Sequence, residues 1–94
     1  MANAIYSPDA RADLRESIRF IGRDSPAAAR RWAARIRKTR RLLADNPQIG
    51  ERRPQFMHGC RSFSIGNYVI FFRAVPTGIE VLRIVRGERD LKRL

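Results

Sequence analysis

The hydrophobic residues of this chain recur every three or four positions in the first half and alternate with polar residues in the last third. Helical spacing begins with four apolar residues, namely Ala10, Leu14, Ile18 and Ile21. Ser7-Pro8-Asp9 precedes them and offers a capping hydroxyl, a proline suited to the first helical position and an acid for the positive end of the helix dipole. These features predict an amphipathic helix, which we expect Gly22 to end.

A second helix is predicted because Asp24-Ser25-Pro26 repeats the same start signal. Asn46-Pro47 is expected to stop it, since the residue before a proline disfavours helical geometry. The connection between the two helices is only a few residues long, which predicts an antiparallel helix hairpin. The buried stripe of the second helix is expected to consist of Ala29, Trp32, Ala33, Ile36 and Leu43.

Strands are predicted before and after the helix hairpin. Asn3 to Tyr6 is a short candidate strand, and Gln48 to Cys60 is expected to be an irregular connection. Gly66-Asn67 is a two-residue hairpin signal, and Val75 to Gly78 is a second turn. The strands around these turns are expected at 61–65, 68–74 and 79–86. The fold class is therefore α+β, with the order β-α-α-β-β-β and an antiparallel sheet packed on the helix hairpin.

The turn positions predict the strand register and therefore the two faces of the sheet. A two-residue turn places Ile65 across from Tyr68, and the second hairpin places Arg73 across from Glu80, where opposite charges attract. One face then carries Phe63, Ile65, Tyr68, Ile70, Phe72, Ile79, Val81 and Val85, and we expect it to pack on the helices. The other face carries Val69, Phe71, Leu82 and Ile84, rimmed by Arg73, Glu80, Arg86 and two serines.

The second face is apolar enough that we expect another segment to pack on it, because burying each large side chain there contributes a stabilising free energy of roughly 1.5–3 kcal/mol. Two such segments are compatible with the sequence. The C-terminal tail can fold back through Leu91 and Leu94, or a partner chain can dock on the face.

Charge narrows the class of partner without choosing one. The chain has 94 residues, enough for one domain over 1–94, and a formal net charge of +11. Such a chain attracts polyanions, so the pattern leaves open both an acidic protein and nucleic acid. The second helix concentrates this charge outside its stripe in Arg30, Arg31, Arg35, Arg37, Lys38, Arg40 and Arg41, which is typical either of a solvated face or of a nucleic-acid-binding helix.

Few residues point to metal, cofactor or membrane chemistry. Cys60 is the only cysteine, so the chain cannot form an internal disulfide, and His58 with Cys60 is the only His/Cys pair. We expect no metal and no cofactor. The longest apolar run, Tyr68 to Phe72, is too short to span a bilayer, and the N-terminus has no secretory pattern. These features favour a cytoplasmic protein.

RNA cleavage is the enzymatic alternative that the residues allow. It needs a group for proton transfer and cations for the phosphate. His58 or Tyr68 would have to move the proton, and the strand arginines at 61, 73, 83 and 86 would supply charge. Tyr68 is predicted to be core, His58 lies in a loop, and the register places the arginines on different faces. We therefore expect no catalytic residues and no enzymatic activity.

The order of motifs along nearly the whole chain resembles the ParE branch of the RelE/ParE toxin superfamily. The resemblance rests on Ser7-Pro8-Asp9-Ala10 with Asp13-Leu14, on Ser25-Pro26 with Trp32, on Leu42-Leu43-Ala44 with Pro47 and Gly50, on Gly59 with Arg61, on Tyr68-Val69-Ile70-Phe71, and on the closing Ile84-Val85-Arg86-Gly87-Glu88-Arg89-Asp90.

The resemblance implies the toxin of a type II toxin–antitoxin system, neutralised by an acidic ParD-like antitoxin and acting on DNA gyrase. The alternative is a RelE-type ribosome-dependent mRNA endoribonuclease, a branch that often has a tyrosine near the C-terminus. The tail here, residues 89–94, has no tyrosine, and Arg86 stands where the family usually has a histidine. Taken with the second face, the resemblance implies an antitoxin-binding surface formed by Val69, Phe71, Arg73, Glu80, Leu82, Ile84 and Arg86.

Overall fold

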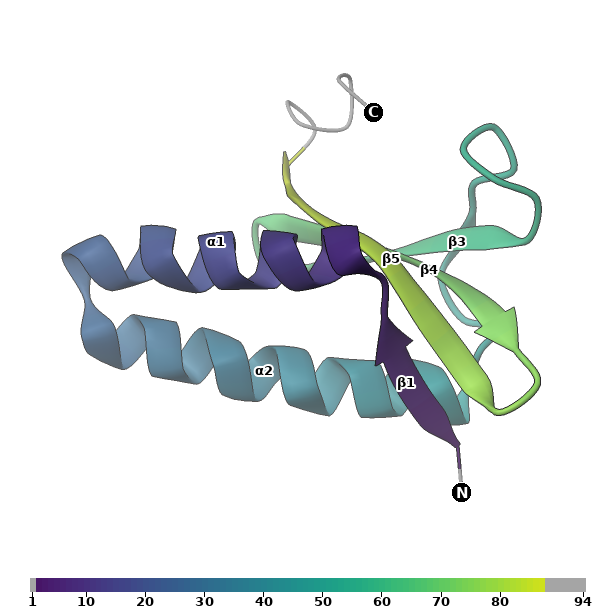
Figure 1. Ribbon diagram of the computed structural model, residues 1–94, viewed down its shortest axis with the longest axis horizontal. Helices are drawn as coiled ribbons and strands as arrows, with labels where there is room; N and C mark the ends of the chain where they lie inside the picture. The colour runs from purple at the N-terminus through teal and green to yellow at the C-terminus, as the bar shows by residue number, and fades with distance from the viewer. Residues whose placement is uncertain (1, 88–94) are drawn as a thin grey trace.

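A five-stranded sheet packs on two helices in the computed structural model, which describes residues 2–87 (Figure 1). The elements are β1 (Asn3–Tyr6), α1 (Pro8–Asp24), α2 (Pro26–Asp45), β2 (Glu51–Arg52), β3 (Cys60–Ile65), β4 (Tyr68–Val75) and β5 (Gly78–Arg86). Their order in the sheet is β1-β5-β4-β3-β2. The predicted α+β class and helix hairpin are confirmed. The tail expected to cover the second face lies outside the described residues.

Serine caps start both helices as the sequence predicts. The Ser7 hydroxyl accepts from the Ala10 N–H at 3.0 Å, and the Ser25 hydroxyl accepts from the Ala28 N–H at 3.1 Å. The prediction that Gly22 ends α1 is wrong, because the helix continues to Asp24. Gly22 instead faces α2, where an added Cβ would lie 3.6 Å from the Ala29 Cβ. This is an ordinary van der Waals distance, so Gly22 is an interior helical residue at the contact between α1 and α2 and does not end the helix.

The sheet is mixed rather than purely antiparallel. β1 pairs with β5 in parallel, with Asn3 beside Gly78. A Cβ on Gly78 would lie 1.8 Å from the Asn3 carbonyl oxygen, so only glycine admits this close approach. The expected irregular connection over 48–60 also contains β2, which pairs with Ser62 and Arg61 of β3. A strand of two residues is too short to show the alternation of apolar and polar residues that predicts a strand from sequence.

Both predicted hairpin registers are confirmed near their turns. Ile65 pairs with Tyr68 across the Gly66-Asn67 turn, and Arg73 pairs with Glu80 in the second hairpin. A β-bulge then shifts the register between β4 and β5, because Phe72 pairs with Val81 but Phe71 pairs with Arg83. Leu82 is the extra residue in β5. Beyond it, every side chain of β5 lies on the face opposite to the one expected.

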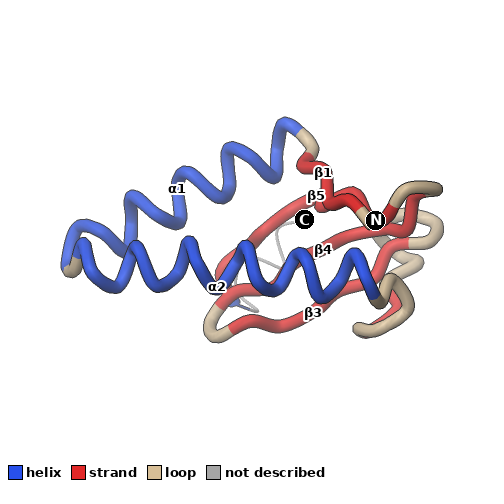
Figure 2. The backbone as a smooth tube through the Cα atoms, turned by 90° about the horizontal axis from the view of Figure 1, so that it is seen from below, coloured by secondary structure: helices blue, strands red, loops and turns tan. Residues whose placement is uncertain are grey.

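The main core lies between the helix hairpin and one face of the sheet. Figure 2 shows α2 crossing in front of β3 and β4 on this side of the sheet. Phe72, Ile79, Leu43 and Ala10 are fully buried there. The Trp32 indole N–H donates to the Ser17 hydroxyl at 2.8 Å, and its ring lies 4.5 Å from that of Tyr68 between centroids. The predicted α2 stripe is confirmed at Ala29, Trp32, Ile36 and Leu43, while Ala33 is only partly buried.

Candidate functional site

The face of the sheet that points away from the helices carries a second, smaller apolar cluster. Cys60, Phe71 and Val85 are buried in it, and Val69 and Leu82 are partly buried beside them. We call these five residues the apolar strip. The sequence placed Val69, Phe71 and Leu82 on this face, and the structure brings all three together with Arg73 and Glu80, which are paired at the rim.

Ile84 and Arg86, the other two predicted members, lie on the opposite face because of the β-bulge. Ile84 pairs with Ile70 and is buried in the main core. The Arg86 guanidinium lies over the Phe20 ring of α1, 4.3 Å from its centroid. In exchange, Val85, which was expected against the helices, pairs with Val69 and belongs to the apolar strip.

The connection between β2 and β3 extends over one end of the apolar strip. Its Phe56 ring meets Phe71 edge-on, with centroids 5.0 Å apart. A small pocket of about 200 Å³ lies at this contact, lined by Phe56, Met57, Cys60, Phe71, Leu82 and Arg83. Phe56 and Met57 remain 39% and 44% exposed. Neither residue was predicted to belong to this face, although two adjacent large apolar residues in a connection are a usable sequence signal.

Paired charges surround the apolar strip. The Arg73 Nε donates to a Glu80 carboxylate oxygen at 2.8 Å, and Arg53 contacts Glu51 at 3.0 Å while donating to the Ser62 hydroxyl at 2.9 Å. The Arg83 guanidinium donates twice to the Asp13 carboxylate of α1, at 2.8 and 3.2 Å. This hydrogen bond raises the pKa of Arg83 above its ordinary value. An apolar centre with a polar, hydrogen-bonded rim is the usual anatomy of a protein interface.

Cys60 sits in the apolar strip as a protonated thiol. Its burial raises the pKa above the ordinary value, and the nearby Arg53 charge offsets only part of that effect. Since the thiolate is the reactive and metal-binding form, a raised pKa makes this cysteine a poor nucleophile. Within residues 2–87, no group of three or more His, Cys, Asp and Glu side chains has a metal-binding arrangement.

The two candidates for proton transfer do not lie together. His58 is exposed in the connection before β3, whereas Tyr68 is buried against Trp32 on the helix side. Tyr68 pairs with Ile65 at the far end of β3 from Cys60, a separation of roughly 17 Å along the strand. Three of the four strand arginines considered for phosphate binding contact other groups of the protein. Arg73 pairs with Glu80, Arg83 pairs with Asp13, and Arg61 donates to the Gly50 carbonyl at 3.3 Å.

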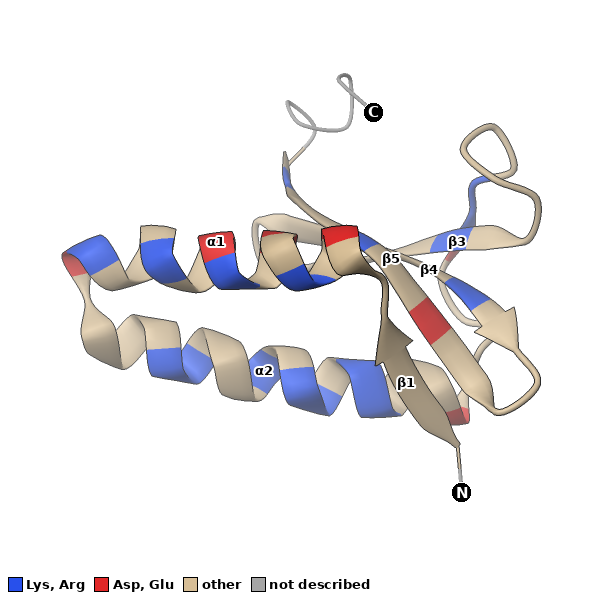
Figure 3. Cartoon of the chain, viewed as in Figure 1, with Lys and Arg blue, Asp and Glu red and all other residues tan. Residues whose placement is uncertain are grey.

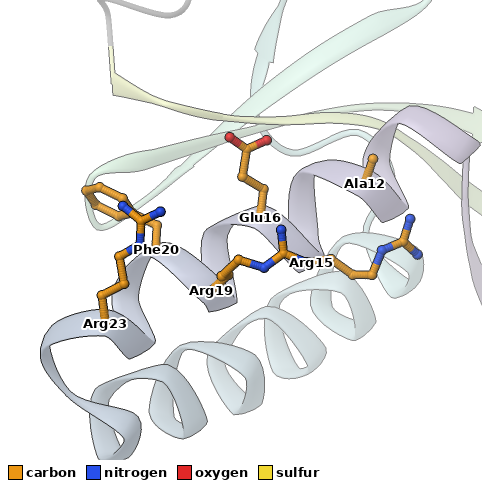
Figure 4. Close-up of a pocket in the computed structure, with 6 residues that line it drawn as sticks. All are labelled: Ala12, Arg15, Glu16, Arg19, Phe20 and Arg23. Carbon is orange, nitrogen blue, oxygen red and sulfur yellow. The ribbon is translucent and has the colours of Figure 1, made fainter.

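A second hollow, of about 440 Å³, lies on α1 (Figure 4). Its lining consists of Ala12, Arg15, Glu16, Arg19, Phe20 and Arg23, all from the same helix. Phe20 is 45% exposed there. The lining mixes one carboxylate with three guanidinium groups on a single exposed helix face, so it resembles an ordinary solvated surface. Nowhere in the described part of the chain is a helix long and apolar enough to cross a membrane.

Comparison with known proteins supplies a family and a fold. Residues 4–91 match the family model described as the ParE toxin of the type II toxin–antitoxin system parDE. A solved structure titled "Chromosomal ParDE TA system from P. aeruginosa" superposes with a TM-score of 0.73 at 23% sequence identity. The match covers 93% of this chain and 97% of that one. No curated protein matches this sequence.

Proposed function

The chain belongs to the ParE toxin family of type II toxin–antitoxin systems, and we propose that an acidic, ParD-like antitoxin neutralises it by docking on the apolar strip. The observation that carries this proposal is the apolar strip itself. It forms a second hydrophobic cluster on the side of the sheet away from the helices, with Val69 and Leu82 only partly buried. A partner that covers these side chains gains apolar burial of roughly 25 cal/mol per Å².

Charge supports an acidic partner for the same surface. The chain carries a formal net charge of +11, which accelerates encounter with a negatively charged protein. The pocket beside Phe71 is the right size for one apolar side chain to anchor the partner. Around it, the carboxylates of Glu80 and Asp13 already pair with arginines, so the rim presents hydrogen-bonding groups without unpaired buried charge.

DNA gyrase is the target that we propose for the free toxin, acting without catalysis. This target follows from the ParE branch of the family and not from a gyrase-binding surface. The separation of His58 from Tyr68 supports a non-enzymatic role, because general acid–base catalysis needs its groups within hydrogen-bond reach of one substrate.

A supercoiling assay with purified gyrase tests the target. We expect the purified chain to block supercoiling and the acidic antitoxin to restore it. Mapping mRNA 5′ ends after induction tests the alternative, a ribosome-dependent endoribonuclease. Unimpaired supercoiling at saturating protein, together with new codon-phased cuts, would replace the gyrase proposal with the nuclease.

A further inference from the structure

The positive charge of this protein is concentrated on one helix. α2 carries seven basic side chains and a single acidic one, whereas α1 carries four of each. Figure 3 shows the contrast, with Lys and Arg repeated along α2 and both signs present on α1. Six of the seven cations are exposed: Arg30, Arg31, Arg35, Arg37, Lys38 and Arg41. The seventh, Arg40, lies over the Tyr6 ring.

None of the six exposed cations takes part in an ion pair with another residue of the described range 2–87. By contrast, Arg53, Arg73 and Arg83 in and around the sheet each contact a carboxylate. Six uncompensated charges over about 16 Å of helix repel one another, which favours binding of an anion with regularly repeated charge.

The six cations form two rows along α2, because successive residues turn by about 100° around a helix. Arg30, Arg37 and Arg41 make one row, and Arg31, Arg35 and Lys38 make the other, roughly 100° away. The crest between the rows holds Ala27 and Ala34, which are exposed and have no hydrogen-bonding side chain. A cation row on each flank suits a helix that lies between two lines of phosphate.

We propose that this exposed face of α2 binds the phosphate backbone of duplex DNA without regard to sequence. An α-helix with its side chains is about 10–12 Å across and fits the major groove of B-DNA, about 12 Å wide. The two rows then reach the two strands that border the groove. Small alanines on the crest allow close approach and make no base-specific hydrogen bond, so binding energy comes from phosphates.

Other occupants fit this surface less well. Protein interfaces have an apolar centre depleted of lysine. The central part of α2 offers no large exposed apolar side chain, since Leu42 lies near the end of the helix. Single-stranded nucleic acid is held by stacking on aromatic rings, and the only aromatic residue of α2, Trp32, is buried. Duplex RNA has a deep, narrow major groove that excludes a helix.

The location of this face makes it independent of the apolar strip. α2 packs on one side of the sheet through Trp32, Ile36 and Leu43. Of the exposed cations, Arg35 reaches back to the Gly66 turn between β3 and β4, whereas the other five lie around the side of the helix opposite the buried stripe. The apolar strip lies on the other side of the sheet. A protein docked on the strip therefore leaves the cation rows accessible.

Fluorescence anisotropy with a labelled DNA duplex of arbitrary sequence, about two helical turns long, tests this inference. The affinity of the purified chain is expected to fall with salt, with a log–log slope of about 0.9 per phosphate contact. The double variant Arg37→Gln/Lys38→Gln removes one cation from each row. It should reduce the slope by about 2 and weaken binding at low salt by roughly tenfold or more.

The matched control is Arg15→Gln/Arg19→Gln on α1, which removes the same charge from another exposed helix face. It should weaken binding by less than about threefold, since only the long-range field changes. Equal losses in the two double variants, or no binding by the wild type at low salt, would overturn the site. A strong preference for one DNA sequence, or equal binding of an RNA duplex, would contradict the groove geometry.

An affinity measurement with the acidic antitoxin separates a protein occupant from DNA. The Arg37→Gln/Lys38→Gln variant is expected to bind the antitoxin within about threefold of wild type, because only the long-range field changes. A loss of roughly tenfold or more would assign α2 to the antitoxin and overturn the DNA site. Circular dichroism of each variant checks that the helix hairpin is intact.

Discussion

The Asp13 carboxylate of α1 accepts a hydrogen bond at 2.9 Å from the backbone N–H of Ile84, which lies in β5, 71 residues further along the chain. The same carboxylate binds the Arg83 guanidinium. Ser7, at the start of α1, donates its hydroxyl proton to the Leu82 carbonyl at 2.9 Å. The N-terminal part of α1 therefore supplies hydrogen-bond partners for the Leu82 carbonyl and the Ile84 N–H of β5, beyond Val81, where the pairing with β1 ends. These bonds lie next to the β-bulge that turns Val85 toward the apolar strip.

Replacing Asp13 with alanine is expected to destabilise the protein by about 1–3 kcal/mol, because the Ile84 N–H loses its acceptor and Arg83 its partner. The exposure of Arg83 limits the contribution of the ion pair itself. Chemical denaturation measures the difference. Glu16→Ala, an exposed acid on the same helix, is the control for loss of negative charge and should cost less than about 0.5 kcal/mol. Similar losses in both variants would show that the Asp13 hydrogen bonds contribute little.

The buried pair formed by Ser17 and Trp32 should be similarly sensitive. Ser17 is 4% exposed, and its hydroxyl accepts the indole N–H while donating to the Leu14 carbonyl at 2.7 Å. Ser17→Ala leaves the indole N–H without an acceptor and should cost about 1–3 kcal/mol. Trp32, the only tryptophan, reports the unfolding by fluorescence. The exposed Ser64→Ala is the matched control, and an equal effect at both serines would contradict the role of the hydrogen bond.

Cys60 makes stability depend on alkaline pH. Its pKa is raised in the folded state by burial, so the unfolded chain loses the thiol proton first as the pH rises. The contribution of Cys60 is fully present below the unfolded pKa of about 8.5 and is lost as the pH rises through the folded value. Denaturation midpoints should therefore fall more steeply above about pH 8.5 for wild type than for Cys60→Ala. Parallel pH profiles would show that the thiol is not the cause.

The strand pairing close to each turn was predictable from the sequence because the turn residues define it. Gly66-Asn67 and the facing charges of Arg73 and Glu80 are local signals, and both registers are confirmed. The bulge at Leu82 was not predicted, since apolar residues occupy both alternating positions from Val81 to Val85. One clue was present. An unbroken register would have turned Arg83 toward the helix core, and the bulge moves it to the other face.

The candidate site was predicted in part for the same reason. Val69 and Phe71 lie on the expected face because they belong to β4, whose alternation the bulge in β5 does not change, and Leu82 is the bulged residue itself. Ile84 and Arg86 follow the bulge in β5 and lie on the opposite face. Phe56 and Met57 reach the apolar strip from an irregular connection, where side-chain direction has no period to follow. The prediction that Gly22 ends α1 was wrong because a glycine inside a helix and a glycine at a helix end look alike in one sequence.

The central claim is that the apolar strip binds the antitoxin, and Leu82 is the residue that tests it best. Leu82 is only partly buried in the strip, so arginine there adds a charge at the docking surface. Phe71 is less suitable because it is 2% exposed and its replacement would also disturb the fold. Leu42→Arg, at a position 46% exposed on α2, is the matched control with the same change of side chain and charge.

Calorimetric titration of the acidic antitoxin into the wild type, Leu82→Arg and Leu42→Arg is the most direct measurement. Burying an unpaired charge at an interface centre should cost at least about 2 kcal/mol, so Leu82→Arg should weaken binding by roughly 30-fold or more. Leu42→Arg should stay within about threefold of wild type, and both variants should retain the wild-type circular dichroism spectrum. Wild-type affinity in a folded Leu82→Arg variant would contradict the account.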